Sequence, residues 1–290
     1  MAGIIIFGAG QAGLAAWRLM QRRDGAVTAF ADNNRALEGT TVAGLPVLSA
    51  QQAAAENPDE ILIAVTGKDR SEAVAADVRA AGYTGTITFF DDVRQRFDIR
   101  LATCRRLAEE AARLGVSGAV AELGVYRGDF SAELSRMFPD RKIYLYDTFA
   151  GFDARDLAAG GGEDGPRAAS WDFSGTSVEL VLGKMLYPER VIVRAGYFPE
   201  SIAESDFGGK FAAVSLDADL YGPTRAGLEF FYPRLSPGGF MILDDFESRQ
   251  FPGAGKAIRE FCAATGVFPV PLCDVHGTAV LVKPRTGGDT

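Results

Sequence analysis

The chain has 290 residues, of which 47% are apolar and 23% are charged, a composition typical of folded globular proteins and enough length for two α/β domains. The formal net charge of −8, from 30 basic and 38 acidic residues, argues against a protein that holds nucleic acid through phosphate contacts. Three cysteines and a single histidine exclude a disulfide framework and any site that needs two imidazoles.

A membrane span needs roughly 18 or more consecutive apolar residues, and the sequence contains no such run. The opening stretch 1–10 carries no basic residue and reaches glycines at once, unlike a secretory signal. We therefore expect a cytoplasmic protein, with neither a membrane nor a nucleic acid as partner. We also expect the chain to form a homo-oligomer.

Residues 1–92 predict a small Rossmann-like domain, because short apolar runs alternate with amphipathic stretches and polar turns. Strands are predicted over 3–7, 26–30, 60–65 and 87–90, with a short extended piece at 45–48, and helices are predicted up to about Arg23 and over 69–81. This alternation is typical of a parallel sheet with helical crossovers.

Charged residues become denser in the segment 93–115, where Ala, Leu and Arg recur at helical spacing. The pattern predicts a linker helix with an amphipathic face over 101–114. Gly115 would end that helix, because glycine readily adopts the left-handed conformation that follows many helices.

Residues 116–290 restart the alternation and predict a second Rossmann-like α/β domain. Strands are predicted over 118–123, 142–146, 190–194, 211–216, 239–243 and 278–282. The segment 151–175, rich in Gly, Ala, Asp and Arg, is long for an idle connection, and such segments are usually lids or disordered. Thr176 and Glu179 give the next helix a capping-box start, and His276, before the last strand, is given no role.

The first glycine-rich motif follows the first predicted strand and contains Gly8, Gly10 and Gly13. Asp32 stands at the end of the next strand, where an acid can bond a ribose. A helix that starts after Gly13 would present free N–H groups to a phosphate. A domain that binds nothing would need the same glycines for packing, so the sequence leaves a nucleotide site and a packing role both open.

The second motif again lies between a strand and a helix, but its two glycines, Gly124 and Gly128, are four residues apart. This wider turn suits a ligand whose amino-acid portion, and not a pyrophosphate, lies over the loop. Asp147 ends the next strand, where an acid commonly accepts both ribose hydroxyls of a nucleoside. An ordinary turn with a solvated aspartate is the alternative, and the two signals together favour a ligand site.

Four carboxylates follow two further predicted strands, Asp217 and Asp219 after one and Asp244 and Asp245 after the next. If the strands are neighbours, the acids meet at the edge where open α/β sheets bind ligands. Like charges so close repel unless a cation or shared protons offset them. Carboxylates without thiols or imidazoles point to a hard ion, Mg²⁺ or Ca²⁺, and solvated acids at strand ends are the alternative.

With these motifs, residues 116–285 resemble the class I S-adenosylmethionine-dependent methyltransferases, and more closely the macrocin, mycinamicin and novobiocin sugar O-methyltransferases. Five segments carry the resemblance in a specific order: 122–129 (ELGVYRGD), 146–152 (YDTFAGF), 196–202 (GYFPESI), 216–224 (LDADLYGPT) and 232–245 (YPRLSPGGFMILDD). The resemblance implies a mostly parallel, seven-stranded sheet. Ala218 and Phe246 stand where the family usually has glycine and tyrosine, and neither change removes a ligand group.

The resemblance also implies roles for the site residues. Asp217, Asp244 and Asp245 would hold Mg²⁺, and Asp219 would be the general base. The S-adenosylmethionine pocket would include Glu122, Gly124, Tyr126, Gly128, Asp147, Thr148 and Asp217. Such a site would align an acceptor oxygen with the methyl group and remove its proton.

Residues 1–92 fall outside that family and resemble the small Rossmann-like N-terminal domain of bacterial sugar N-acyltransferases. The whole chain is therefore expected to be an O-methyltransferase that uses S-adenosylmethionine and Mg²⁺ on a sugar or sugar-containing small molecule of polysaccharide or natural-product biosynthesis. The alternative is a nucleotide-dependent oxidoreductase or sugar-nucleotide-binding enzyme run by the first domain. Residues 1–92 contain neither a histidine nor a YxxxK motif for the proton relay that a dehydrogenase needs.

Overall fold

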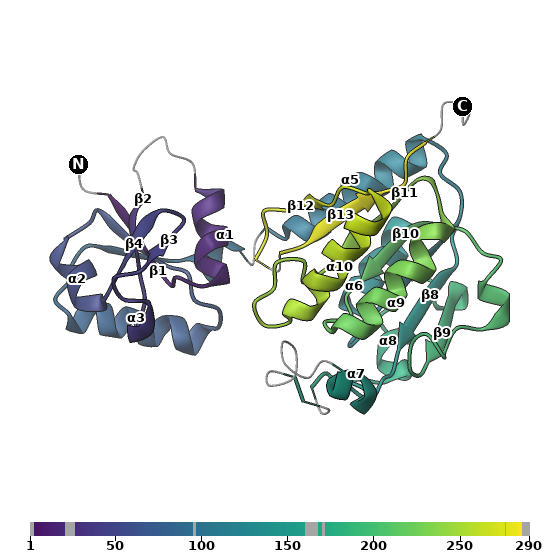
Figure 1. Cartoon of the computed structure of the whole chain (residues 1–290), viewed down its shortest axis with the longest axis horizontal. Coiled ribbons are helices and arrows are strands. Elements are labelled where there is room, and N and C mark those ends of the chain that lie inside the picture. Colours follow the sequence, from purple (N-terminus) through teal and green to yellow (C-terminus); the bar gives the residue numbers. More distant parts are fainter. Residues whose placement is uncertain are drawn as a thin grey trace. The chain divides into compact units, whose positions relative to one another are not determined.

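The computed structural model describes residues 3–20, 27–94, 97–159, 168–169, 172–275 and 277–285. These residues fold as two compact units, each around its own β-sheet (Figure 1). The first unit comprises the described residues up to Asp98 together with Cys273–Val275, and the second unit comprises the others from Ile99 onward. The predicted α/β class with two sheets is therefore confirmed.

The sheet of the first unit has the strand order β3-β4-β2-β1-β5-β6, and all its pairs are parallel except β3 with β4. Its strands are β1 (Ile4–Phe7), β2 (Val27–Ala31), β3 (Thr41–Val42), β4 (Leu45–Leu48), β5 (Glu60–Ile63) and β6 (Thr86–Phe89). Its helices are α1 (Gln11–Leu19), α2 (Ala50–Ala55), α3 (Lys68–Ala80) and α4 (Phe90–Arg94), with a 3₁₀ turn at Arg35–Leu37. The central strand β1 is apolar throughout, as expected for a strand covered on both faces.

The sheet of the second unit has the order β12-β13-β11-β10-β7-β8-β9, and its pairs are parallel except the two that involve β13. Its strands are β7 (Ala119–Leu123), β8 (Ile143–Asp147), β9 (Val191–Ala195), β10 (Phe211–Leu216), β11 (Leu235–Leu243), β12 (Val270–Pro271) and β13 (Ala279–Val282). Its helices are α5 (Ile99–Arg113), α6 (Asp129–Met137), α7 (Ala154–Ala159), α8 (Val178–Leu182), α9 (Tyr221–Phe231) and α10 (Pro252–Thr265), with 3₁₀ turns at Pro188–Arg190, Glu204–Asp206 and Tyr232–Arg234. The expected seven-stranded, mostly parallel sheet is confirmed.

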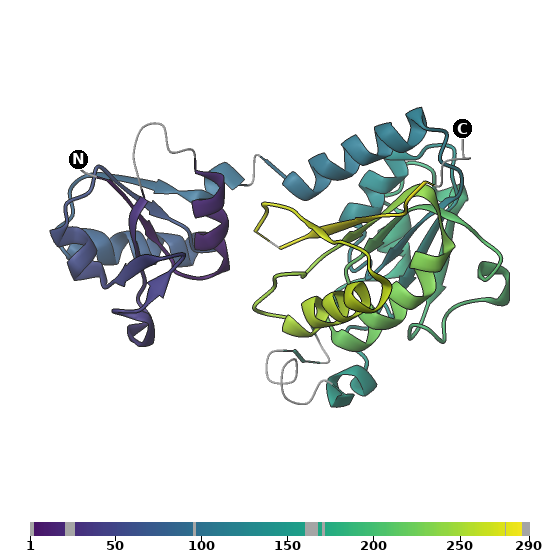
Figure 2. The same cartoon turned by 45° about the horizontal axis from the view of Figure 1, so that its top comes forward.

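Helices cover both faces of this second sheet. Successive side chains of a strand point to opposite faces, so a single strand contributes to the core on each face. Met241 and Leu243 of β11 join a core cluster with residues of α9 and α10. Phe240 and Ile242 of the same strand join a second cluster with residues of α5, α6 and α8. Figure 2 shows α5 and α10 on opposite sides of the sheet. The carboxyl ends of the central strands stay uncovered by these helices, and the site forms there.

The segment 93–115, predicted as a linker helix, contains the end of α4 and the whole of α5. Cys104, Ala108 and Ala111 of α5 are buried in the core of the second unit, at the spacing of one helix face. The helix is thus part of the second unit, and the division of the chain falls between Asp98 and Ile99. The sequence showed the amphipathic face of the helix but not the sheet that covers it.

The structure differs from the sequence pattern in several further elements. The two-residue strands β3 and β12 and the short helix α2 were not predicted, α7 lies inside the segment 151–175, and β11 begins four residues before the predicted strand. The cap of α8 is Ser177, whose Oγ accepts a hydrogen bond from the Leu180 N–H, so the helix starts one residue later than the predicted capping box. Arg23, residues 160–167 and His276 lie outside the described residues.

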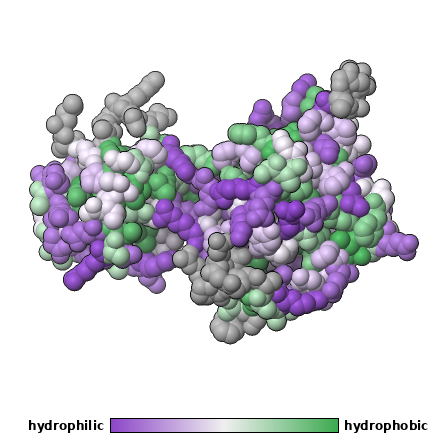
Figure 3. Space-filling model, in the orientation of Figure 1, coloured by the Kyte–Doolittle hydropathy of each residue, from purple (hydrophilic) through white to green (hydrophobic). Residues whose placement is uncertain are grey.

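The exposed side of α5 carries the ion pairs Arg106–Glu109 and Arg113–Glu110. On the face drawn in Figure 3, hydrophilic and hydrophobic residues are interspersed over the second unit. Among the described residues, none of the helices combines the length and the apolar character that crossing a membrane requires.

Candidate functional site

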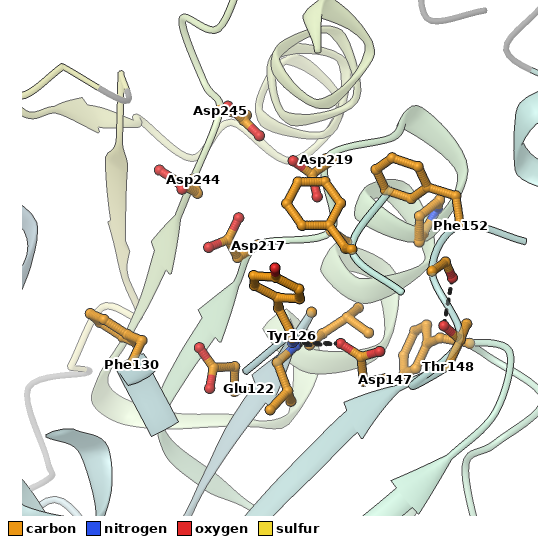
Figure 4. Close-up of a pocket in the computed structure, with 18 of the residues that line it drawn as sticks. Glu122, Tyr126, Phe130, Asp147, Thr148, Phe152, Asp217, Asp219, Asp244 and Asp245 are labelled. Carbon is orange, nitrogen blue, oxygen red and sulfur yellow. Dashed lines mark hydrogen bonds between the residues drawn. The ribbon is translucent and has the colours of Figure 1, made fainter. Parts of the chain in front are cut away.

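The carboxyl ends of β7, β8, β10 and β11 open into a cavity of about 470 Å³, at the edge where open α/β sheets bind ligands. Figure 4 shows acidic and aromatic side chains that converge on it from these strand ends. The predicted site residues that line it are Glu122, Gly124, Tyr126, Asp147, Thr148, Asp217, Asp219, Asp244 and Asp245. Gly128 instead packs against α8, where a Cβ would lie 2.8 Å from the Val181 side chain.

The glycine-rich loop after β7, residues 124–128, lies directly against the end of β10. Gly124 has a φ of +84°, and a Cβ at this position would be 1.8 Å from the carbonyl oxygen of Asp217. Only glycine allows such an approach. The predicted cofactor loop and the first predicted metal ligand are therefore in backbone contact.

The carboxylate of Asp147, at the end of β8, anchors this glycine-rich loop. One oxygen accepts hydrogen bonds from the N–H groups of Val125 and Tyr126, at 2.7 and 2.8 Å, and the other accepts from the Phe149 N–H at 2.7 Å. From the sequence, these oxygens were expected to accept ribose hydroxyls. A carboxylate has about four lone-pair sites, and three backbone donors already use most of them.

Asp32 in the first unit makes the same kind of contact. One of its oxygens accepts a hydrogen bond from the Ala9 N–H, and the other accepts from the Asn34 N–H, both at 2.8 Å. An acid at the end of the second strand therefore ties down the loop after the first strand in both units. The presence of such an acid is not by itself a sign of a bound ribose.

Packing explains two of the three glycines in the first motif. A Cβ on Gly8 would lie 2.5 Å from the carbonyl oxygen of Ala64, and a Cβ on Gly13 would lie 1.8 Å from the carbonyl oxygen of Gly8. A Cβ on Gly10 would meet no atom within 4 Å. Close packing therefore explains Gly8 and Gly13, and Gly10 has no such contact.

Two parallel strands bring four aspartates together, and we call Asp217, Asp219, Asp244 and Asp245 the acid cluster. β10 and β11 pair in a register that places the last residues of both strands side by side, so the residues that follow leave the sheet together. Asp219 and Asp245 have φ values of 58° and 56°, a conformation that costs a non-glycine residue on the order of 1–3 kcal/mol. Strain of this kind persists where the surrounding structure fixes the direction of a functional side chain.

Three members of the acid cluster are arranged as a group that could hold a metal ion. Asp217, Asp219 and Asp245 each offer one carboxylate oxygen, and these oxygens all lie within 4.8 Å of one another. Oxygen donors of this type suit a hard divalent ion such as Mg²⁺. From the sequence, Asp217, Asp244 and Asp245 were expected as the metal ligands. The structure groups Asp217 and Asp245 with Asp219 instead of Asp244.

Arg100, in the first turn of α5, is a site residue that the sequence analysis missed. Its Nη1 donates to Asp217 and to Asp244, at 2.9 Å each, and its Nη2 donates to the Ser215 hydroxyl at 3.2 Å. The second oxygen of Asp244 accepts a hydrogen bond from Thr278 Oγ1 at 3.0 Å. Both oxygens of Asp244 are thus engaged by the protein itself.

The position of Arg100 on its helix was the one sequence signal that could have revealed it. Arg100 precedes Cys104 by four residues and Cys104 precedes Ala108 by four, so the three lie on one helix face. Cys104 and Ala108 are buried, and the Arg100 side chain is only 12% exposed. An arginine on the buried face of an amphipathic helix requires an acidic partner, and the acid cluster is that partner.

Burial and mutual repulsion raise the pKa values of the acids in the cavity. Burial, together with Asp244, raises the pKa of Asp217 to about 6, and the same two causes raise the pKa of Asp245 to about 7. Burial and the neighbouring carboxylates raise the pKa of Asp219 well above its usual value. Burial also raises the pKa of Glu122 to about 8. Such a group of acids retains protons or binds a cation near neutral pH.

Four of the aromatic residues that line the cavity pack against one another, and we call Tyr126, Phe152, Phe173 and Phe251 the aromatic wall. Phe173 meets Tyr126 and Phe152 edge-on, with ring centroids 5.2 and 5.3 Å apart, and Phe251 lies 5.9 Å from Phe152. These edge-to-face contacts are favourable and hold the rings in place. Tyr126 and Phe173 remain 39% and 38% exposed, so the wall offers apolar surface to a ligand.

Residues 67–283 match the model of the family described as Macrocin-O-methyltransferase (TylF). The chain is 30% identical over 185 residues to Mycinamicin III 3''-O-methyltransferase of Micromonospora griseorubida, a match that covers 58% of this chain and 69% of that protein. It is 28% identical over 193 residues to 8-demethyl-8-(2,3-dimethoxy-alpha-L-rhamnosyl)-tetracenomycin-C 4'-O-methyltransferase of Streptomyces olivaceus, over 62% of this chain and 71% of that protein.

Solved structures show the same fold. The O-methyltransferase NovP superposes with a TM-score of 0.55 at 25% identity, and the match covers 64% of this chain and 80% of NovP. The calicheamicin methyltransferase CalS11 superposes with a TM-score of 0.52 at 23% identity, over 63% of this chain and 77% of CalS11. These matches agree with a class I methyltransferase fold.

Proposed function

We propose a function for this chain, which belongs to the macrocin O-methyltransferase family and is an O-methyltransferase. It transfers a methyl group from S-adenosylmethionine to a hydroxyl of a sugar or sugar-containing small molecule, with Mg²⁺ in the acid cluster. The observation that carries the proposal is one cavity lined by the glycine-rich loop, the acid cluster and the aromatic wall. Its volume of about 470 Å³ falls in the range of small-molecule sites.

The cofactor side of the proposed site is the glycine-rich loop with Glu122 and Asp147. S-adenosylmethionine, when bound, supplies a methyl group that its sulfonium makes electrophilic. Gly124 keeps the loop against the end of β10, so a cofactor over the loop would lie next to Asp217. Asp147 acts mainly by fixing the loop amides, and the lone-pair site left on its carboxylate is available to a ribose hydroxyl.

The metal side of the proposed site is the acid cluster, whose oxygen donors fit Mg²⁺. We propose Asp217 and Asp245 as ligands, because the family resemblance and the geometry both select them. Asp244, the third ligand expected from the sequence, would have to leave Arg100 to reach the ion, so we propose that it holds Arg100 instead. Mg²⁺, when bound, would lower the pKa of an acceptor hydroxyl.

We propose Asp219 as the general base. Its carboxylate lies within 4.8 Å of the ligand oxygens of Asp217 and Asp245, so it can reach a hydroxyl held beside them. The positive φ of Asp219 fixes the direction of its side chain, which favours a single proton-transfer geometry.

A sugar is the acceptor class that best matches the two surfaces of the cavity. Pyranose rings carry hydroxyls at the rim and C–H groups on the faces, so the acid cluster suits the former and the aromatic wall suits the latter. The relative from Streptomyces olivaceus is named as a 4'-O-methyltransferase of a rhamnosyl-tetracenomycin. A glycosylated compound with an apolar aglycone would use the same two surfaces.

We propose a supporting role for the first unit, in positioning the acceptor or in pairing subunits. All the residues that line the cavity belong to the second unit. The alternative of an oxidoreductase run by the first unit depended on Gly8, Gly10, Gly13 and Asp32. Contacts with neighbouring backbone account for Gly8, Gly13 and Asp32, but not for Gly10.

The proposed function predicts metal-dependent methylation of sugars. Purified protein with S-adenosylmethionine, Mg²⁺ and a panel of glycosylated natural products and nucleotide sugars should yield a product one methyl group heavier, located on the sugar by tandem mass spectrometry. EDTA should abolish the reaction, and excess Mg²⁺ should restore it. Full activity in EDTA would refute the metal, and methylation of an aglycone hydroxyl alone would refute the sugar acceptor.

Asp219→Asn should slow the chemical step by about 10²–10⁴, because the amide keeps the shape of the side chain but cannot take the proton. Single-turnover rates measure this step, and calorimetry should show nearly unchanged affinity for S-adenosylhomocysteine. Asp153→Asn is a matched control, since Asp153 lines the same cavity but pairs with Arg155, and it should leave the rate within a fewfold of the parent. Equal rates for the Asp219→Asn variant and the parent would eliminate Asp219 as the base.

Asp147→Ala should weaken S-adenosylhomocysteine binding by about tenfold or more, because it frees the amides of Val125 and Tyr126. Hydrogen bonds to a charged group contribute about 1.5–3 kcal/mol. Asp32→Ala removes the equivalent anchor from the first unit and should leave this affinity unchanged. Calorimetry measures the affinity of both variants for S-adenosylhomocysteine. Equal affinities in the two would contradict the role of Asp147.

A further inference from the structure

We propose that Arg100 occupies a cation position inside the acid cluster that a divalent ion would otherwise take, and that it limits the number of ions the cluster can bind. The inference goes beyond the proposed Mg²⁺ site, because it concerns a second position, between Asp217 and Asp244. Arg100 in this role is a positioning residue: it contacts acids of the cluster and acts through them.

The contacts of Arg100 converge as those of a bound ion would. A single atom, Nη1, lies 2.9 Å from a carboxylate oxygen of Asp217 and 2.9 Å from one of Asp244. The neighbouring Nη2 lies 3.2 Å from the hydroxyl oxygen of Ser215. Two carboxylates converge on one nitrogen, and a hydroxyl lies beside the neighbouring nitrogen; oxygen donors of this kind suit hard divalent ions. The guanidinium therefore fills a position that the surrounding oxygens would otherwise offer to a metal.

The guanidinium of Arg100 is fixed in this position by its surroundings. Its central carbon lies 4.3 Å from the centre of the Phe130 ring, a cation–π contact that strengthens where water is excluded. Cys104 and Ala108 anchor the helix that carries it in the core of the second unit. The charge of an arginine is permanent at physiological pH, so this cation does not leave by losing a proton.

Arg100 therefore divides the acid cluster into two parts. Asp217 and Asp244 share the arginine, whereas Asp217, Asp219 and Asp245 each place one carboxylate oxygen within 4.8 Å of the others. An ion can enter the second part only, next to Asp219. In this arrangement an acceptor hydroxyl held by the ion is also within reach of the proposed base, and a competing position between Asp217 and Asp244 is closed.

The inference predicts that Arg100→Gln binds one more divalent ion per chain than the parent protein. Mn²⁺ is the probe, because it prefers the same oxygen donors and its free form is counted by electron paramagnetic resonance. The number of Mn²⁺ ions that the parent binds per chain tests the proposed metal site. The difference in this number between the variant and the parent tests the role of Arg100. A parent that binds none and a variant that binds one would therefore support the inference and refute the proposed metal site.

Two control variants separate the position of Arg100 from general charge effects. Arg105→Gln removes a positive charge from the same helix, but Arg105 is 54% exposed and pairs with Glu133, so the ion count should match the parent. Arg100→Lys keeps a cation in place and should also match the parent. An Arg100→Gln variant with the parent's count, or a Lys variant that gains the same extra ion, would overturn the inference.

The loss of a buried cation could unfold Arg100→Gln in the absence of metal, and circular dichroism detects this directly. In that case the readout is refolding in millimolar Mn²⁺, because an ion in the vacated position would replace the lost charge. Recovery of the folded signal in Mn²⁺ but not in an equal ionic strength of NaCl supports the inference. Failure to refold in Mn²⁺ counts against it.

Discussion

Repulsion among the four carboxylates of the acid cluster is the constraint that the second unit has to satisfy. The parallel pairing of β10 and β11 forces their ends, and the aspartates that follow, to lie side by side. Two like charges about 4 Å apart at a protein surface repel by roughly 4 kcal/mol, so the cluster persists only with cations or protons beside it. Arg100 supplies one positive charge from within the chain, and the group of Asp217, Asp219 and Asp245 is left for a divalent ion. The strained backbone at Asp219 and Asp245 is consistent with side chains held in place against this repulsion.

The end of β10 connects the proposed cofactor region with the proposed metal region. Gly124 packs against the carbonyl of Asp217, so a cofactor over the glycine-rich loop and a metal at the acid cluster would be neighbours through backbone contact. Asp147 then fixes the loop through its amides. Methyl transfer needs the methyl carbon and the acceptor oxygen in line, and such alignment can supply several kcal/mol of the barrier reduction. A rigid backbone connection between the two binding regions is a direct way to obtain it.

The sequence predicted most of the second unit because its apolar runs and motif spacings are local signals. The strands that carry the site, the glycine-rich loop and all four aspartates were placed correctly at the strand ends. Arg100 was missed because its partners are more than a hundred residues away in sequence and become neighbours only when α5 packs on the sheet. For the same reason the sequence could not show that Asp244 faces Arg100, or that Asp147 and Asp32 are used by backbone donors. The two-residue strands β3 and β12 are too short to give a periodic pattern.

The most direct test of this account is a crystal structure of the protein with S-adenosylhomocysteine and Mn²⁺, recorded at a wavelength where manganese scatters anomalously. The account predicts one anomalous peak per chain, bonded to Asp217 and Asp245 and next to Asp219, with Arg100 still in contact with Asp244. S-adenosylhomocysteine should lie over residues 124–128. A peak between Asp217 and Asp244 with Arg100 displaced, or no peak in the acid cluster at saturating Mn²⁺, would contradict it.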